Sequence, residues 1–207
     1  MKYYIYISDA KVNMLLPQIS SEAKKNISTE LKFDLKILSL TRKSETDPIS
    51  ERIKRLEIVS SFIQDFGNVG TITNPNEYIY DVAPLRMSII EKTDLVYLGG
   101  ECAQTLILLG GSARHLLDRG CAITTCACGS HLIPMLKCIE QLSHTNEELT
   151  DIGDRLIYKP ECAVIEALRS LQGPEQRFEF LAKRLYYESS SYRSILIVTP
   201  LYIALAD

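Results

Sequence analysis

Tryptophan is absent from this chain of 207 residues, as is any apolar run of the ~18 residues that a membrane-spanning helix needs. An excess of basic residues is also lacking, and the formal net charge of −3 argues against general binding of nucleic acid. No secretory signal is visible, because a strand-like segment, Tyr3–Ser8, comes first. We therefore expect no membrane association and no general nucleic-acid partner.

Two nucleotide-binding motifs and one hydrolase motif are missing as well. The sequence contains neither a G-x-x-x-x-G-K-[ST] phosphate loop nor a G-x-G-x-x-G dinucleotide fingerprint. It has no G-x-S-x-G nucleophile elbow, since the segment Gly110–Arg114 has the wrong spacing. Any phosphate site in this protein is therefore of another type.

What is present is the composition of an ordinary globular protein, with 46% hydrophobic and 24% charged residues. A chain of this length buries roughly 70% of its unfolded surface, which is enough for a core without disulfides. Six cysteines in a chain without a visible secretory signal indicate reduced thiols. We predict a single domain over residues 1–207, located in the cytoplasm, with no cofactor.

The most informative stretch is residues 94–118, which contains two apolar segments, each closed by a pair of glycines. We predict that Val96–Leu98 and Leu106–Leu109 are buried neighbouring strands, and that a glycine-rich loop then opens a short helix. Glycine permits positive φ or close approach, Ser112 suits a helix N-cap, and helix N-termini attract anions. The predicted anion site comprises Gly99, Gly100, Gly110, Gly111, Ser112, Arg114 and His115.

A second set of polar residues follows the first predicted strand. Ser8, Asp9 and Lys11 come at the end of, or just after, the apolar segment of residues 2–8. In open α/β sheets, ligands bind beyond the carboxyl ends of the strands. If this strand is central, the three side chains line the same rim as the glycine-rich loop. We therefore add them to the predicted ligand-binding site.

Residues up to 92 combine strands with one clear helix. Residues 31–37 alternate between apolar and polar side chains, as in a half-buried strand. Residues 47–66 carry an apolar stripe at helical spacing, with Pro48 suited to the first helical position. Residues 74–92 have no clean period and are interrupted by Pro84, so we predict an irregular segment there.

The last third is expected to be mainly helical. Apolar residues recur at helical spacing over 132–142, 163–171 and 175–187. Residues 194–199 are typical of a buried strand, and Pro200 must end its regular pairing or lie at an edge. The predicted fold is a single α/β or α+β domain, with a mixed sheet of about five or six strands and a helical C-terminal third.

A group of candidate metal ligands or reactive thiols lies beyond Gly120. It consists of Cys121, Cys126, Cys128 and His131, with Cys138 a little later. Zinc usually takes two short-spaced pairs of ligands, and this C-x4-C-x-C-x2-H spacing is not a common one. Free thiols are our prediction, with a metal or a redox role as alternatives. A nucleophile–base pair, either Ser112 with His115 or Cys128 with His131, is a further alternative.

Five segments spread over nearly the whole chain carry a likeness to known sequences: Tyr3–Lys11, Val96–Gly100, Leu109–His115, Gly173–Arg184 and Thr199–Leu205. In these segments the chain resembles a family of bacterial proteins of similar length that carries only a domain-of-unknown-function label. The resemblance implies one domain and a bacterial cytosolic setting. It implies no catalytic residue, because no established activity is attached to that family.

Three hypotheses about function remain. The leading one is binding or sensing of a nucleotide or other phosphorylated small molecule, for example as a cyclic-oligonucleotide sensor in bacterial defence. The second is an enzyme that cleaves a phosphodiester or glycosidic bond in a nucleotide, with Asp9, Glu101 or His115 as acid or base. The third is a non-catalytic interaction module, such as a homodimer, with Tyr78 and Tyr80 at the contact.

Overall fold

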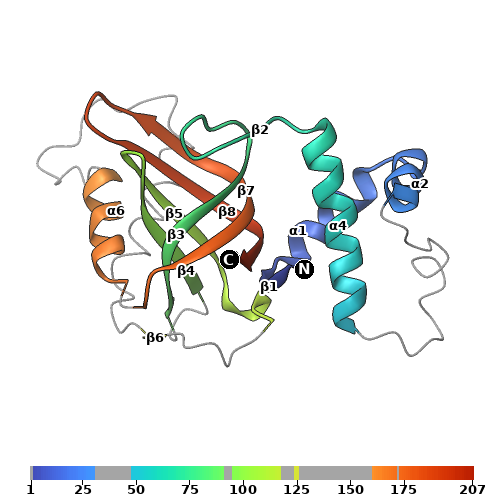
Figure 1. The fold of residues 1–207 in the computed structure, drawn as a ribbon, viewed down its shortest axis with the longest axis horizontal. Coiled ribbons are helices and arrows are strands. Elements are labelled where there is room, and N and C mark those ends of the chain that lie inside the picture. Colours follow the sequence, from blue (N-terminus) through green and yellow to red (C-terminus); the bar gives the residue numbers. More distant parts are fainter. Residues whose placement is uncertain (1, 31–47, 91–94, 118–123, 126–159, 172) are drawn as a thin grey trace, which may run out of the picture.

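The computed structural model describes residues 2–30, 48–90, 95–117, 124–125, 160–171 and 173–207. In this part of the chain, five strands form a closed barrel with helices packed against its outer sides (Figure 1). The barrel strands are β3 (Tyr78–Ile90), β4 (Leu95–Cys102), β5 (Thr105–Ser112), β7 (Gln176–Ser189) and β8 (Ser194–Leu205). No helix within the described ranges has the length and apolar character required to cross a bilayer.

The strands are hydrogen-bonded in the order β3–β4–β5–β8–β7, and β7 returns to β3 to close the ring. All of these pairs are antiparallel except β5 with β8. Closure joins segments far apart in sequence, because Tyr78 lies opposite Lys183. Short strands extend the ring: β1 (Tyr3–Ile7) on β8, and β2 (Val69–Gly70) and β6 (Thr124–Thr125) on β3.

Side chains from alternate strand positions fill the barrel interior. In β5, Ile107 and Leu109 belong to the interior cluster, whereas Leu106 and Leu108 pack on the outer side. All four are at most 3% exposed. Burial on both faces explains why this strand is a continuous apolar run in the sequence.

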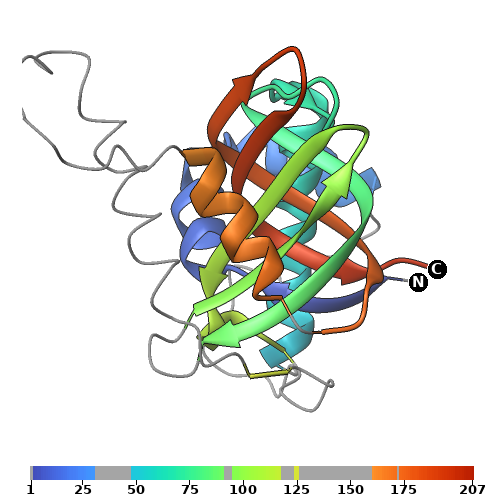
Figure 2. The ribbon, with the colours of Figure 1, turned by 90° about the vertical axis from the view of Figure 1, so that its left-hand side faces the viewer.

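Helix α6 (Pro160–Arg169) covers one outer side of the barrel and corresponds to the helix predicted at residues 163–171 (Figure 2). Val164 and Ala167 of this helix pack in one cluster with the outward-facing leucines of β5. A β-carbon at Gly99 of β4 would collide with Leu168, so glycine at this position lets the helix lie close to the sheet.

Another outer side, formed mainly by β1, β7 and β8, is covered by the remaining helices. These are α1 (Asp9–Leu15), the 3-10 turn η1 (Leu16–Gln18), α2 (Ser21–Glu30) and α4 (Pro48–Phe66). The helix predicted at residues 47–66 is confirmed as α4. Leu56 and Val59 are fully buried as expected, whereas the terminal Ile49 and Phe66 are 46% and 69% exposed.

The predicted α/β or α+β fold with a helical C-terminal third is wrong, because the described end of the chain consists of β7 and β8. The spacing of Phe178, Leu181 and Leu185 predicts a helix where β7 is found. In β7, Phe178 and Phe180 fill the barrel, while Leu181 is buried on the outer side beneath the helices. Burial on both faces removes the alternation by which a strand is recognised.

The prediction of an irregular segment at residues 74–92 is also wrong, because most of this segment forms strand β3. Pro84 fits because β3 pairs with β4 only from Arg86 onward, so the missing amide costs no bond on that side. Pro200 lies in β8 between the part paired with β5 and the part paired with β1. The strand therefore continues past Pro200. The predicted strand at 31–37 and helix at 132–142 lie outside the described residues.

Candidate functional site

The predicted pair of buried strands is confirmed as the β4–β5 hairpin. Leu98 lies opposite Leu109, and both are at most 1% exposed. Ala103 and Gln104 form the turn, with φ of 46° and 64°, as two-residue hairpin turns require. No glycine in the described ranges has positive φ, so the glycines do not form a loop as predicted.

The two glycine pairs lie inside the strands, at opposite ends of the hairpin. Gly99 and Gly100 pair with residues near the turn, whereas Gly110 and Gly111 lie at the far end of β5. A β-carbon at Gly111 would meet the hydroxyl end of Tyr6, so this glycine allows close packing. Gly99 and Gly100 therefore do not belong with the rest of the predicted site.

Ser112 does not open an α-helix. The chain continues from β5 into a single 3-10 turn, η3 (Ala113–His115), and the Ser112 side chain makes no capping hydrogen bond. Its hydroxyl accepts a 2.9 Å hydrogen bond from Nε of Arg114. An anion at this corner would therefore be held by side chains, because a full helix N-terminus is not available.

The fold nevertheless brings the two predicted sets of polar residues together. After η3 the chain runs beside β1, where Leu116 forms a β-bridge with Tyr6. This arrangement brings the imidazole of His115 next to the carboxylate of Asp9 at the start of α1. We call this group the charged rim; it consists of Ser8, Asp9, Lys11, Arg52, Arg114 and His115.

Asp9 is held by Arg52 of α4. Nε of Arg52 donates to Oδ1 of Asp9 at 2.9 Å, and Nη2 lies 2.8 Å from Oδ2. Both side chains keep access to solvent, at 26% for Arg52 and 38% for Asp9. The sequence gives no signal for Arg52, because charges off the apolar stripe of a helix normally form a solvated face. Only the packing of α4 beside β1 brings it to the rim.

His115 lies beside the same carboxylate. Its Nδ1 is 3.7 Å from Oδ2 of Asp9, and its ring packs edge-on to Tyr6 with centroids 5.9 Å apart. Burial lowers the pKa of His115, the Asp9 carboxylate raises it, and the surrounding cations lower it again, so the pKa is below its ordinary value. The lowered pKa favours the neutral imidazole, which is the form that can accept a proton.

In the described part of the chain, the acceptors of Lys11 are both neutral. Its Nζ donates to the Pro200 carbonyl at 2.9 Å and lies 3.5 Å from the hydroxyl oxygen of Ser8, which is 2% exposed. Burial lowers the pKa of Lys11 to about 8. Because burial disfavours the ammonium group and no described carboxylate is bonded to it, a negatively charged ligand would stabilise it.

Tyr6 adds a buried hydroxyl next to the rim. The residue is 1% exposed, and burial raises its pKa to about 12. The hydroxyl lies close to Ser8 and to the Ser112 backbone, yet it makes no well-formed hydrogen bond with any residue in the described ranges. A buried donor without an acceptor is costly, by about 1–3 kcal/mol, unless a ligand or water satisfies it.

The charged rim has a positive balance in a protein whose net charge is −3. Among the described residues, the charges of three cations, Lys11, Arg52 and Arg114, and of one carboxylate, Asp9, influence the pKa of His115, and these four charges sum to two positive charges. Local excess charge of this kind attracts anions, and the planar guanidinium of arginine matches phosphate geometry.

Glu101, the third predicted acid or base, lies away from the rim. It is near the turn end of β4, and its Oε1 is 3.4 Å from Nη2 of Arg193. The acid–base pair that the described residues offer is therefore Asp9 with His115. The group of Cys121, Cys126, Cys128, His131 and Cys138 lies outside the described residues, whereas Cys102 of β4 is a free thiol.

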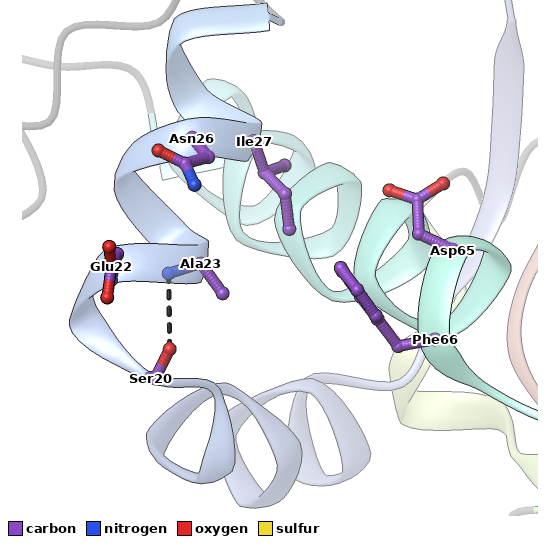
Figure 3. Close-up of a pocket in the computed structure, with 7 residues that line it drawn as sticks. All are labelled: Ser20, Glu22, Ala23, Asn26, Ile27, Asp65 and Phe66. Atoms are coloured by element: carbon purple, nitrogen blue, oxygen red, sulfur yellow. Dashed lines mark hydrogen bonds between the residues drawn. The ribbon is translucent and has the colours of Figure 1, made fainter.

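Two cavities lie among the helices, apart from the charged rim. The larger has a volume of about 360 Å³ and separates α2 from α4, with Ile27 and Phe66 projecting into it (Figure 3). Its lining includes the carboxylates of Glu22 and Asp65 and no lysine or arginine. A cavity of about 160 Å³ shares Phe66 and has mainly apolar walls. Neither cavity has the charge that an anion site needs.

Comparison with curated proteins and with solved structures found no match. A family match, in contrast, covers nearly the whole chain, from residue 2 to residue 207, in agreement with the resemblance carried by the five sequence segments. The chain belongs to the family described as "Family of unknown function (DUF7019)".

Proposed function

We propose that the protein binds a phosphorylated small molecule, with nucleotides as the leading class, at the charged rim. The observation that carries this proposal is the convergence of Lys11, Arg52 and Arg114, from α1, α4 and η3, around His115, with Asp9 bound to Arg52 beside it. Phosphate oxygens would accept hydrogen bonds from Lys11 and Arg114.

The test is a thermal-shift screen with inorganic phosphate, AMP, ATP and cyclic oligonucleotides, followed by calorimetry on the compounds that stabilise the protein. A ligand that binds only the folded state raises the melting temperature. Arg114 is exposed, so Arg114→Ala should fold normally. The loss of one charged hydrogen bond should weaken binding roughly ten- to hundredfold.

Arg193→Ala is the matched control, because it removes an arginine that pairs with Glu101 near the hairpin turn. Its affinity for the ligand should equal that of the wild type. The proposal fails if none of these anions stabilises the protein, or if the two arginine variants lose the same affinity.

A nucleotide hydrolase is the second candidate, and one contact favours it. The neutral imidazole of His115 lies 3.7 Å from the Asp9 carboxylate, an arrangement that could orient a general base toward water. Product analysis on the compounds that bind would detect turnover. In that case, His115→Gln should abolish turnover while ligand binding persists, and a variant with unchanged turnover would contradict the role of His115.

A further inference from the structure

A second polar group lies on an outer side of the barrel, independent of the charged rim. Tyr4 of β1 and Tyr202 of β8 pack edge-on, with ring centroids 5.4 Å apart, and Tyr80 of β3 is close to both. Two carboxylates, Glu57 of α4 and Glu179 of β7, lie near enough for their negative charges to add to the effect of burial in raising the pKa of the Tyr4 hydroxyl. These five residues, from five different elements, are called the tyrosine box below.

The ammonium group of Lys2 occupies this box. Its Nζ donates to Oε1 of Glu179 at 2.6 Å and lies 5.5 and 5.9 Å from the ring centroids of Tyr202 and Tyr80. The Tyr202 hydroxyl donates to the same carboxylate oxygen at 2.6 Å. Aromatic faces combined with a carboxylate are the chemistry by which proteins recognise ammonium ligands.

The box has one more negative charge than Lys2 can balance. Glu179 pairs with Lys2, whereas Glu57 has no hydrogen bond or ion pair with any residue in the described part of the chain. Burial raises the pKa of Glu57, which shows that its ionised form is under-compensated, and the charge of Lys2 lowers this pKa only in part. A second cation beside Glu57 would therefore stabilise the box.

The Lys2 side chain can also be released from the tyrosine box without disturbing the barrel. Lys2 precedes β1, which begins at Tyr3, so its release breaks no strand pairing. Its side chain is 45% exposed, whereas that of Glu179 is 16% exposed. We propose that the tyrosine box binds a small organic diamine, whose first ammonium group replaces that of Lys2 and whose second lies against Glu57. Lys2 then acts as an intramolecular competitor that fills the box when no diamine is present.

The experiment is calorimetric titration of the full chain with 1,4-diaminobutane and with n-butylamine, at pH 7 and constant ionic strength. Lys2→Ala should bind 1,4-diaminobutane about tenfold more tightly than the wild type, because one competing charged hydrogen bond is gone. In the Lys2→Ala background, Glu57→Gln should weaken binding of the diamine about tenfold and leave binding of n-butylamine unchanged. Lys2→Gln replaces Lys2→Ala if circular dichroism shows that the alanine variant is unfolded.

Lys183 provides a matched control. Its ammonium group lies 5.2 Å from the ring centroid of Tyr78 and 2.8 Å from Glu77, but both charged side chains are about half exposed and only one ring takes part. Lys183→Ala should bind the diamine with wild-type affinity. The proposal is overturned if removing Lys2 does not tighten binding of the diamine, or if Glu57→Gln weakens both amines equally. The box would then only anchor the start of β1.

Discussion

Gly110 and Gly111 are neighbours in β5, yet their replacement by alanine should change stability in opposite directions. A β-carbon at Gly111 would overlap the Tyr6 hydroxyl, and Tyr6 is 1% exposed and therefore has little room to move. Overpacking of this kind costs about 1–3 kcal/mol. A β-carbon at Gly110 would meet no atom within 4 Å, and its φ is not positive. Alanine there should stabilise the strand by about 0.5–1 kcal/mol.

The assay is thermal unfolding of the two variants and the wild type, with urea unfolding as a second measure. For a chain of this size, 1 kcal/mol corresponds to about 2–4 °C in melting temperature. Gly111→Ala should therefore lower the melting temperature by about 2–12 °C, and Gly110→Ala should raise it by about 1–4 °C.

Tyr6→Phe is the control for this pair, because it removes the oxygen nearest to the new methyl group and leaves the ring carbon Cζ at 2.9 Å. Gly111→Ala should cost less in the Tyr6→Phe background, which a double-mutant cycle measures. Equal losses at Gly110 and Gly111, or a cost at Gly111 that does not depend on the Tyr6 hydroxyl, would refute the packing explanation of these glycines.

Two further predictions concern Lys11 of the charged rim and the Tyr6 hydroxyl beside it. Tyr6→Phe alone should raise the free energy of unfolding by about 1 kcal/mol, because it removes a buried hydroxyl that has no acceptor among the described residues; urea unfolding checks this effect. Lys11 has its pKa lowered from 10.5 to about 8, so between these values the unfolded chain binds more protons and stability should rise with pH. Lys11→Met should lack this rise in urea midpoints measured from pH 8 to 10, and an identical pH profile would contradict the burial of Lys11.

Local sequence patterns were sufficient for the elements that present one clear signal. Helix α4 has an apolar stripe at helical spacing with Pro48 at its start, and nothing else fits that pattern. The β4–β5 hairpin follows from two short apolar runs separated by a few polar residues. Ser8, Asp9 and Lys11 could also be recognised from the sequence as polar residues that follow a strand. Their proposed role in binding stays a prediction.

The approach of these residues to Ser112, Arg114 and His115 was predicted for a reason that the fold does not support. The expectation required β1 to be a central strand, whereas within the described ranges β1 pairs with a single strand, β8. The two groups meet because the segment after η3 runs back along β1 through the bridge between Tyr6 and Leu116. A contact between segments about a hundred residues apart has no local signature, so neither this bridge nor the arrival of Arg52 could be predicted.

The sequence by itself determined which segments are apolar enough to be buried and where one helix begins and ends. Tertiary structure alone decided that the strands close into a barrel. Closure buries the inner face of β7 through Phe178 and Phe180 and its outer face through Leu181, so the alternation that marks a half-buried strand disappears. It also decided where proline is tolerated, because Pro84 and Pro200 lie where their strands lack a partner on one side. Such effects depend on which distant strand lies alongside, and a local pattern carries no information about that neighbour.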